Sequence, residues 1–413
     1  MRGMGAGPEV RPDRAPVDQR LPREVWVLVT VSFVIAIGFG IVAPALPTFA
    51  RSFDVSVTAA SIVVSAFAFM RLAFAPASGK LVSRFGERPV YIWGITVVGL
   101  STGACAFAAD YGQLLVLRAL GGIGSTMFTV SAVALLIRLT PPPMRGRSTG
   151  LWATSFLLGN VTGPLVGGGL ITISLRAPFV VYAAALFVAA GVAWLFLRRS
   201  TLAGAVPTAE IPALTVRAAL RHRTYRAALA SNFANGWAVF GVRVALVPLF
   251  VVEVLHRAES LAGVALSVFA AGNVAVLMLS GRLADSLGRR LPVLVGLVVS
   301  GTATTWLGVT DGTPEFLVAT LIAGLGTGLI TPPQGAAVAD VIGSQAKGGP
   351  VLAAFQMTAD IGAIIGPVAS GMLADQLSYS AAFLLTGGIS LLAALVWLRA
   401  PETLPVPSRR ATG

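Results

Sequence analysis

The sequence predicts an all-α membrane protein with twelve transmembrane helices in two pseudo-symmetric six-helix bundles. Composition, the spacing of apolar runs and an internal repeat all point to this fold. Of the 413 residues, 55 % are hydrophobic and only 11 % are charged, and the mean hydropathy is +0.83. Soluble domains carry about 25 % charged residues. A surface this poor in charge therefore needs a lipid bilayer as part of its solvent.

Twelve apolar runs are each long enough to cross a bilayer, which takes roughly 20 residues. We expect the spans at 25–49, 56–78, 90–109, 112–137, 148–172, 177–197, 227–252, 259–280, 291–310, 314–338, 350–374 and 379–398. The arginine-rich stretch 198–226 separates two sets of six, so 25–197 and 227–398 are predicted bundles and 198–226 is a cytoplasmic linker. Segments 1–24 and 399–413 are predicted cytoplasmic tails, the first of them disordered.

The distribution of basic residues predicts the orientation. With the N-terminus inside, 24 of the 30 Lys and Arg residues fall in inner segments, and only Arg51, Arg176 and Arg257 fall in outer loops. Lys and Arg concentrate on the cytoplasmic side of membrane proteins. The net charge of +13 therefore indicates topology rather than nucleic-acid binding, and both termini are expected inside.

The two sets of six spans repeat one another. Gly79 and Gly86 match Gly281 and Gly288 at an offset of 202, and "GPLVGG" from residue 163 matches "GPVASG" from residue 366 at an offset of 203. Parallel repeats of six spans are a transporter arrangement in which substrate binds near the midplane, between the halves.

Polar residues within the spans indicate which helices face the interior, because such residues are costly in lipid. Every third span lacks charged, Asn and Gln residues, and we expect these four spans to face lipid. They are 90–109, 177–197, 291–310 and 379–398. The other spans supply the expected substrate-cavity residues: Arg71, Trp152, Phe156, Asn160, Asn232, Asn235, Trp237, Arg243, Asn273 and Gln356. The aromatic and Asn stripes among them are also consistent with helix packing. Pro44 and Pro47 should kink the first span.

Three motifs resemble the major facilitator superfamily, and within it the twelve-span drug:proton antiporters. "GKLVSRFGERPV" (79–90) and "GRLADSLGRRLPV" (281–293) resemble its loop 2–3 signature and the echo of that signature, and "RALGGIG" (118–124) resembles the fourth-helix signature. "GLWATSFLLGNVTGPLVGG" (150–168) resembles the antiporter signature at every fixed position. The chain departs from the loop signature at Ser83, where an acid is usual, and at Glu87, where a base is usual. It also lacks the first-span acid of many multidrug members.

The resemblance implies roles for two groups of residues. We expect tight cytoplasmic turns that form an inner gate, which is asymmetric because Asp285 has no acidic counterpart at Ser83. The gate residues are Gly79, Arg84, Gly86, Arg88, Gly281, Asp285, Gly288 and Arg289. The antiporter-motif residues should shape the contact between the halves through close helix approach. They are Gly150, Gly159, Gly163, Pro164, Gly167 and Gly168.

Asp360 is the one carboxylate well inside a predicted span, roughly at mid-bilayer. Burial raises the affinity of a carboxylate for protons, so Asp360 is the candidate proton-coupling or substrate-contacting group, with a purely structural role as the alternative. Arg118, by the resemblance, is expected to pair with this acid; its alternative is a charge satisfied by backbone carbonyls. Three arginines within spans against one Asp favour an anionic or zwitterionic substrate.

The predicted function is proton-coupled export of small amphipathic compounds or drugs by rocking-bundle alternating access. A facilitator or proton symporter that imports a small metabolite is the alternative. No GxxxxGK[ST] loop, HExxH motif or paired-Asp motif occurs, so neither direct ATP use nor an enzyme is expected. One Cys and two His offer too few ligands for a metal site, and no cofactor is expected beyond the proton gradient. Expected partners are lipid, substrate and protons, for a monomer in the bacterial plasma membrane.

Overall fold

The computed structural model describes residues 21–141, 144–197, 214–343 and 348–404, which form helices joined by short turns. The first half contains α1 (Arg23–Val42), α2 (Ala45–Arg51), α3 (Val57–Phe85), α4 (Glu87–Cys105), α5 (Tyr111–Leu139), α6 (Arg145–Ile171) and α7 (Ala177–Leu197). The second half contains α8 (Val216–Ala219), α9 (Arg223–Asn235), η2 (Gly236–Val242), α10 (Arg243–Glu253), α11 (Ser260–Leu287), α12 (Arg290–Leu307), α13 (Thr313–Ile342), α14 (Gly349–Gln376) and α15 (Tyr379–Leu398). Most of the predicted tails and linker lies outside the described residues, at 1–20, 198–213 and 405–413.

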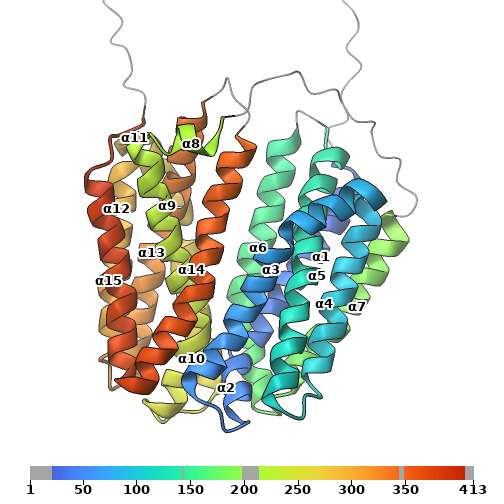
Figure 1. Cartoon of the computed structure of the whole chain (residues 1–413), viewed down its shortest axis with the longest axis vertical. Helices are drawn as coiled ribbons and strands as arrows, with labels where there is room; N and C mark the ends of the chain where they lie inside the picture. The colour runs from blue at the N-terminus through green and yellow to red at the C-terminus, as the bar shows by residue number, and fades with distance from the viewer. Residues whose placement is uncertain (1–20, 142–143, 198–213, 344–347, 405–413) are drawn as a thin grey trace, which may run out of the picture.

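The described helices confirm the all-α membrane fold. Eleven of them are long and apolar enough to cross a membrane, counting α1 with α2 and α9 with α10 as one span each. The twelfth is α4, whose first turn carries Glu87 and Arg88 and is therefore more polar. The helices form two bundles that stand side by side (Figure 1). Helices α12 and α15 lie at the outer edge of one bundle and α4 and α7 at the outer edge of the other. These helices contain the four spans that were expected to face lipid, although α4 and α7 also send side chains to the central cavity.

The first span of each half is interrupted within its length. In the first half, α1 ends at Val42 and α2 begins after Pro44, so the predicted kink is confirmed. In the second half the backbone widens into the π-helical turn η2 before α10. Such π-turns are often found at functional sites, and Phe240 from this turn faces the central cavity.

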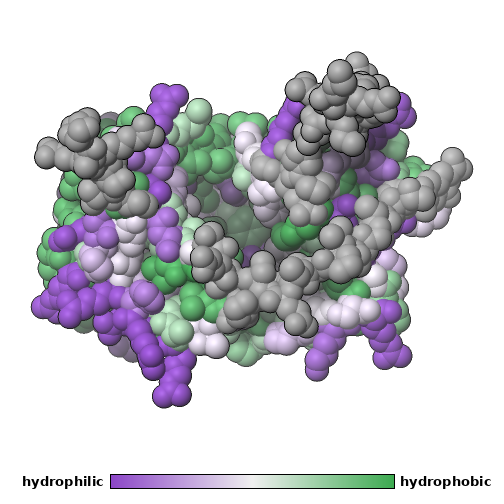
Figure 2. Space-filling model, turned by 90° about the horizontal axis from the view of Figure 1, so that it is seen from above, coloured by the Kyte–Doolittle hydropathy of each residue, from purple (hydrophilic) through white to green (hydrophobic). Residues whose placement is uncertain are grey.

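The two halves are joined at one end of the molecule and apart at the other. We call the end with residues 51–57 and 253–260 the closed face, and the end with the turns at Gly86 and Gly288 the open face. Among the described residues, the hydrogen bonds and ion pairs between halves lie at Arg71 or between Arg71 and the closed face. Seen from the open face, the molecule is hollowed between the halves (Figure 2).

The prediction that residues 79–90 form a loop is wrong in its bounds, because the turn is much shorter. Helix α3 continues through Gly79 to Phe85, and α11 continues through Gly281 to Leu287. A lone glycine costs a helix only about 1 kcal/mol relative to alanine. The chain turns instead at Gly86 and Gly288, whose φ angles of +84° and +95° favour glycine over residues with a side chain.

Candidate functional site

A cavity of about 330 Å³ lies between the halves and opens toward the open face. Most of its wall is apolar or aromatic and comes from all the long helices of the first half, α1 and α3 to α7, with η2, α10 and α14 of the second half completing it. Small-molecule sites occupy about 300–1,000 Å³ and combine an apolar wall with a few polar groups. The predicted site residues on this wall are Arg71, Arg118, Phe156, Asn160, Gln356 and Asp360.

An ion pair inside this cavity joins the two halves. Arg71 Nη2, from α3, lies 2.5 Å from Asp360 Oδ1, from α14. The Asp360 side chain is 14 % exposed and the Arg71 side chain 35 %, so water from the cavity reaches the pair. The expectation that Arg118 pairs with Asp360 is therefore wrong, because Arg71 takes that place.

Close helix approach brings the two partners together. Gly122 of α5 packs on the backbone of α3 at Phe67 and Arg71, and Thr126 Oγ1 donates a hydrogen bond to the Arg71 carbonyl at 2.7 Å. A Cβ at Gly122 would strike that backbone, so a larger residue would push α3 away. Glycine at position 122 thus lets α3 pack directly on α5, and this packing sets the position of the Arg71 backbone.

Asp360 is held from the other side in the same way. Gly236 of η2 lies against the Ala359 carbonyl, and Gly362 of α14 lies against the Phe233 carbonyl. Ser65 of α3 donates to the Ile364 carbonyl at 2.8 Å and so ties α3 to α14 just beyond the ion pair. The two halves are thus in direct contact on the closed-face side of Asp360.

Arg118 is buried on the cavity wall without an acid. It is 6 % exposed, and its guanidinium lies 4.2 Å from the ring centre of Phe67 and 6.0 Å from that of Phe39. No hydrogen bond or ion pair links Arg118 to another residue of the described chain, and its Nε is buried without a partner. The alternative of backbone carbonyls as partners is wrong within the described residues.

Trp152, Phe156 and Asn160 lie four residues apart on α6, and two of these three residues line the cavity. Phe156 and Asn160 line it, while Trp152 packs edge-on against Phe156 with ring centres 4.9 Å apart. Trp152 Nε1 donates to Ser32 Oγ of α1 at 2.9 Å. Trp152 therefore supports the wall from behind rather than forming it.

Five other predicted cavity residues do not lie on the described cavity wall. Asn232 bonds to the Phe355 carbonyl and to Gln334, and Trp237 donates to Thr386, so both serve helix packing. Arg243 is buried 3.8 Å from the ring centre of Phe269. Asn273 has a buried Oδ1 without a partner, and Asn235 is half-buried on α9.

The antiporter-motif glycines divide into two groups. Gly159, Gly163 and Gly167 pack against α1 within their own half, which is not the contact between halves that was expected. Gly168 makes that contact, because it packs against Ser260 and Gly263 of α11. The carbonyl of Pro164 also faces Gly263, whereas Gly150 has nothing close to its Cβ position.

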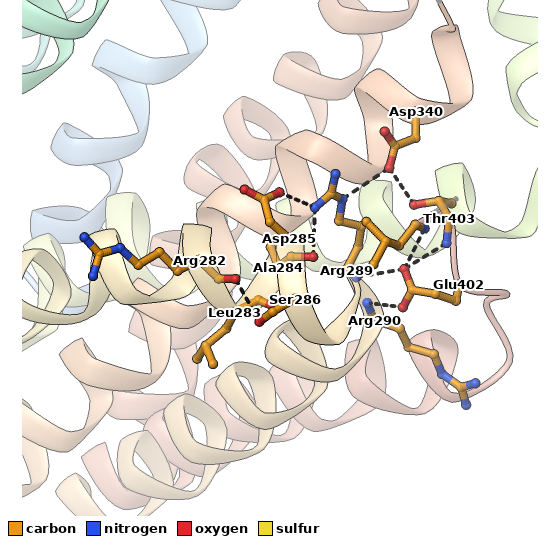
Figure 3. A network of polar contacts seen from close by, with 11 residues as sticks. Arg282, Leu283, Ala284, Asp285, Ser286, Arg289, Arg290, Asp340, Glu402 and Thr403 are labelled. Atoms are coloured by element: carbon orange, nitrogen blue, oxygen red, sulfur yellow. Dashed lines mark hydrogen bonds and ion pairs between the residues drawn. The ribbon is translucent and has the colours of Figure 1, made fainter. Parts of the chain in front are cut away.

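The second open-face turn is held by a network of charges (Figure 3). Arg289 lies 2.6 Å from Asp285 and 3.3 Å from Asp340. The Glu402 carboxylate accepts from the backbone N–H groups of Arg289 at 2.8 Å and Arg290 at 3.0 Å. Burial favours a raised pKa for Glu402, but the backbone N–H donors of Leu404, Arg289, Arg290 and Thr403 outweigh it and lower that pKa.

The first turn is held differently, and the predicted asymmetry is visible there. Ser83 donates to the Gly79 carbonyl of its own helix at 2.8 Å, while Glu87 pairs with Arg138 at 3.1 Å. The Arg84 guanidinium lies 5.4 Å from the ring centre of Phe85, and Arg88 follows Glu87 in the first turn of α4.

Sequence reasoning missed the polar contacts of the closed face. Arg51 Nε lies 2.7 Å from Glu253 Oε1, and Tyr379 donates to Glu253 Oε2 at 2.7 Å. Asp375 accepts from the Val57 and Thr58 backbone N–H groups at the start of α3. Arg51 and Glu253 are 202 residues apart, so the repeat offset places opposite charges at one repeat position. That signal could have found them.

The chain matches the sequence model of the Major Facilitator Superfamily over residues 28–256 and 228–413, which include both bundles and their cavity. The chain belongs to the major facilitator superfamily. This superfamily member is a membrane transporter and not an enzyme, it is integral to a lipid bilayer, and it carries a small-molecule substrate. No cluster of His, Cys, Asp and Glu that could hold a metal occurs among its described residues.

Its similar proteins include named drug-resistance proteins. The chain is 29 % identical to multidrug resistance protein 1 of Bacillus subtilis over 172 residues, 42 % of this chain and 44 % of that protein. It is 23 % identical to the multi-drug resistance efflux pump PmrA of Streptococcus pneumoniae over 86 % of this chain and 90 % of that one. It is 24 % identical to the quinolone resistance protein NorA of Staphylococcus aureus over 38 % of this chain and 40 % of that one. Two of these matches thus span less than half of the relative.

Solved structures share the fold at low identity. A POT family transporter in complex with a thioalcohol-conjugated peptide has a TM-score of 0.76 at 12 % identity, over 91 % of this chain and 96 % of that one. A bacterial homolog of the human lysosomal transporter Spinster, described as inward-facing and unoccupied, has a TM-score of 0.74 at 16 % identity, over 94 % of this chain and 98 % of that one. At these identities the likeness shows the fold alone.

Proposed function

We propose that this chain is a proton-coupled exporter of small amphipathic compounds that works by alternating access. The observation that carries the proposal is the Arg71–Asp360 ion pair, because it lies in the cavity and joins the two halves. A proton on Asp360 removes the negative charge that holds Arg71. Protonation would therefore weaken a link between halves at the same place where substrate is expected to bind.

The cycle follows from this link. With Asp360 ionised, the pair holds α3 against α14, and the cavity is accessible from the open face. With Asp360 protonated, the contact between α3 and α14 keeps the hydrogen bonds of Ser65, Val57 and Thr58, and the Arg51–Glu253 ion pair still joins the halves at the closed face. Exchange in opposite directions then requires that proton and substrate weaken each other's binding, so that one of them occupies the cavity in each crossing.

The nature of the wall supports an amphipathic substrate. Phe39, Phe67, Phe128, Phe156 and Phe240 offer aromatic surface, and the polar groups are few. The names of PmrA and of multidrug resistance protein 1 agree with such a substrate class. We place the protein in the bacterial plasma membrane as a monomer, with the proton gradient as energy source and without a cofactor.

The charge of the open face supports its orientation. Basic residues at or near that face are Lys80, Arg84, Arg138, Arg282 and Arg290. Such residues favour the cytoplasmic side. We therefore propose that both termini are inside and that the cavity opens to the cytoplasm.

The proposal is tested by transport in proteoliposomes with an imposed pH gradient. A lipophilic fluorescent dye should accumulate in vesicles of acidic lumen that contain inside-out protein. Asp360→Asn should abolish the dependence on the gradient. Glu315→Gln, which removes an exposed acid in the first turn of α13, is the matched control and should transport normally.

Two outcomes would count against the proposal. Accumulation in the opposite direction, together with protons, would replace the exporter with a symporter. Equal gradient dependence in wild type and Asp360→Asn would contradict the role of Asp360.

A further inference from the structure

Arg118 is a buried cation on the cavity wall that no anion of the described chain neutralises. It is 6 % exposed and its Nε has no hydrogen-bond partner. The carboxylate on the same wall, Asp360, is held by Arg71 at 2.5 Å. With this pair formed, the ionisable side chains of the wall leave one uncompensated positive charge, at Arg118.

The aromatic neighbours of Arg118 compensate it only in part. The rings of Phe67 and Phe39 attract the guanidinium through a cation–π interaction, which is weaker than a desolvated ion pair. Aromatic rings offer no oxygen to the N–H donors. Guanidinium groups match the geometry of carboxylates, which accept two parallel hydrogen bonds. A buried arginine without such a partner is costly, and a carboxylate that enters the cavity would reduce this cost at Arg118.

Arg243 gives an internal comparison. It is 4 % exposed, two of its nitrogen atoms are buried without a partner, and it lies 3.8 Å from the ring centre of Phe269. Phe67 and Phe269 occupy the same position of the repeat, at the offset of 202. Arg118 lines the described cavity and Arg243 does not. The two arginines are similar in burial and in their aromatic neighbours, but only Arg118 can be reached by a ligand in the described cavity.

We propose that Arg118 binds the anionic group of the substrate, which makes the preferred substrate an amphipathic aromatic carboxylate or a zwitterion with such a group. The Phe67, Phe39 and Phe156 rings would contact its apolar part, and Asn160 and Tyr182 lie on the same wall as further hydrogen-bonding groups. This inference rests on the proposed function, since it names the substrate class of the same cavity.

Binding of two matched probes to the full-length protein in nanodiscs tests the inference. Dansylglycine carries an aromatic group and a carboxylate, and dansylglycinamide has nearly the same shape without the charge. Dansyl fluorescence should report binding of the acid about tenfold tighter than binding of the amide. Arg118→Gln should reduce this preference to about twofold or less, whereas Arg118→Lys should keep most of it because the charge remains.

Arg243→Gln is the matched control, because it removes an equally buried arginine that does not line the described cavity, and it should leave the preference unchanged. Equal affinity for acid and amide in wild type would overturn the inference without any variant having to fold. Retention of the preference in Arg118→Gln, or its loss in Arg243→Gln as well, would overturn it too. An intact preference in a protein that moves no protons would overturn the proposed function and leave the anion site standing.

Discussion

The open-face turns of the two halves carry the same ion pair with its charges exchanged. Glu87 and Arg138 pair at 3.1 Å in the first half, and Arg289 and Asp340 pair at 3.3 Å in the second. Both partners are related by the repeat offset of 202. Each pair joins the start of a third span to the end of a fourth. Both halves therefore keep an ion pair at this junction, but the acid lies on the third span in the first half and on the fourth span in the second half.

The difference between the turns lies in what surrounds the pair. In the second half, Asp285 and Glu402 also bind Arg289, whereas in the first half Ser83 bonds only within its own helix. Glu87 departs from the base of the family signature, and Arg138 supplies the charge that makes this departure compatible with the fold. The exchange also explains how one duplicated unit can tolerate such different local sequences.

Removal of Arg138 should have the largest effect on the first turn. The Glu87 side chain is 8 % exposed, so Arg138→Gln leaves a nearly buried carboxylate without its partner. Breaking a buried pair costs about 3–5 kcal/mol, and the 43 % exposure of the Arg138 side chain reduces this to about 2 kcal/mol. The free energy of unfolding in detergent measures it, with Arg84→Gln as control.

A charge exchange sharpens the same measurement. The double variant Glu87→Arg with Arg138→Asp copies the second half and should restore much of the stability. A loss in Arg138→Gln no larger than that of Arg84→Gln would contradict the comparison.

Alanine substitutions at the two turn glycines should differ in how much they destabilise the protein. Gly86 and Gly288 both have positive φ, which costs alanine about 1–3 kcal/mol. A Cβ at Gly86 would have open space, whereas a Cβ at Gly288 would strike the Glu402 carboxylate. Gly288→Ala should therefore lower the melting temperature more than Gly86→Ala, and equal losses would contradict the role of Glu402.

The Glu402 contact should depend on pH in a defined direction. Its pKa in the folded protein is lowered, since the backbone N–H donors outweigh the effect of burial. The stabilisation is then fully present above the unfolded pKa of about 4.3 and is lost as the pH falls through the lower folded pKa. The difference in unfolding free energy between wild type and Glu402→Gln should shrink below about pH 4. A difference that stays constant from pH 7 to acid would contradict this assignment.

Loss of Asp285 should have the smallest effect. Its side chain is 78 % exposed in the contact with Arg289. An exposed pair four residues apart on a helix contributes about 0.3–0.5 kcal/mol. Asp285→Asn should therefore change the unfolding free energy less than Asp340→Asn, whose carboxylate is 27 % exposed and also accepts from Thr403. A larger loss in Asp285→Asn than in Asp340→Asn, measured under the same conditions, would contradict this prediction. It would show that Asp285 contributes most to the difference between the two turns.

The helices were predictable from the sequence because each span is a continuous apolar run whose length and flanking charges are local properties. The repeat and the lone carboxylate also directed attention to Asp360 before any contact was known. The partner of Asp360 was not predictable in this way. Arg71 reaches it only because α3 and α14 pack together across the halves, and this packing depends on backbone approach at glycines and on Ser65.

The direction in which a helix face points explains the other differences. Asn232 and Trp237 follow the same polar–aromatic pattern as Asn160 and Phe156, yet Asn232 meets Gln334 and Trp237 meets Thr386 on neighbouring helices. A stripe of residues fixes one face of a helix, but it does not determine what that face meets. The closed-face pair Arg51–Glu253 is the reverse case, because the offset of 202 marks it in the sequence.

The central claim is that the Arg71–Asp360 pair couples substrate movement to protons. The most direct measurement is the proton-to-substrate ratio, obtained from the membrane potential and pH gradient at which net dye flux in proteoliposomes reverses. Wild type should reverse at a gradient set by proton exchange. Asp360→Asn should still equilibrate the dye, but its dye flux should reverse only where the electrochemical gradient of the dye is zero. A variant that reverses at the wild-type gradient would contradict the account.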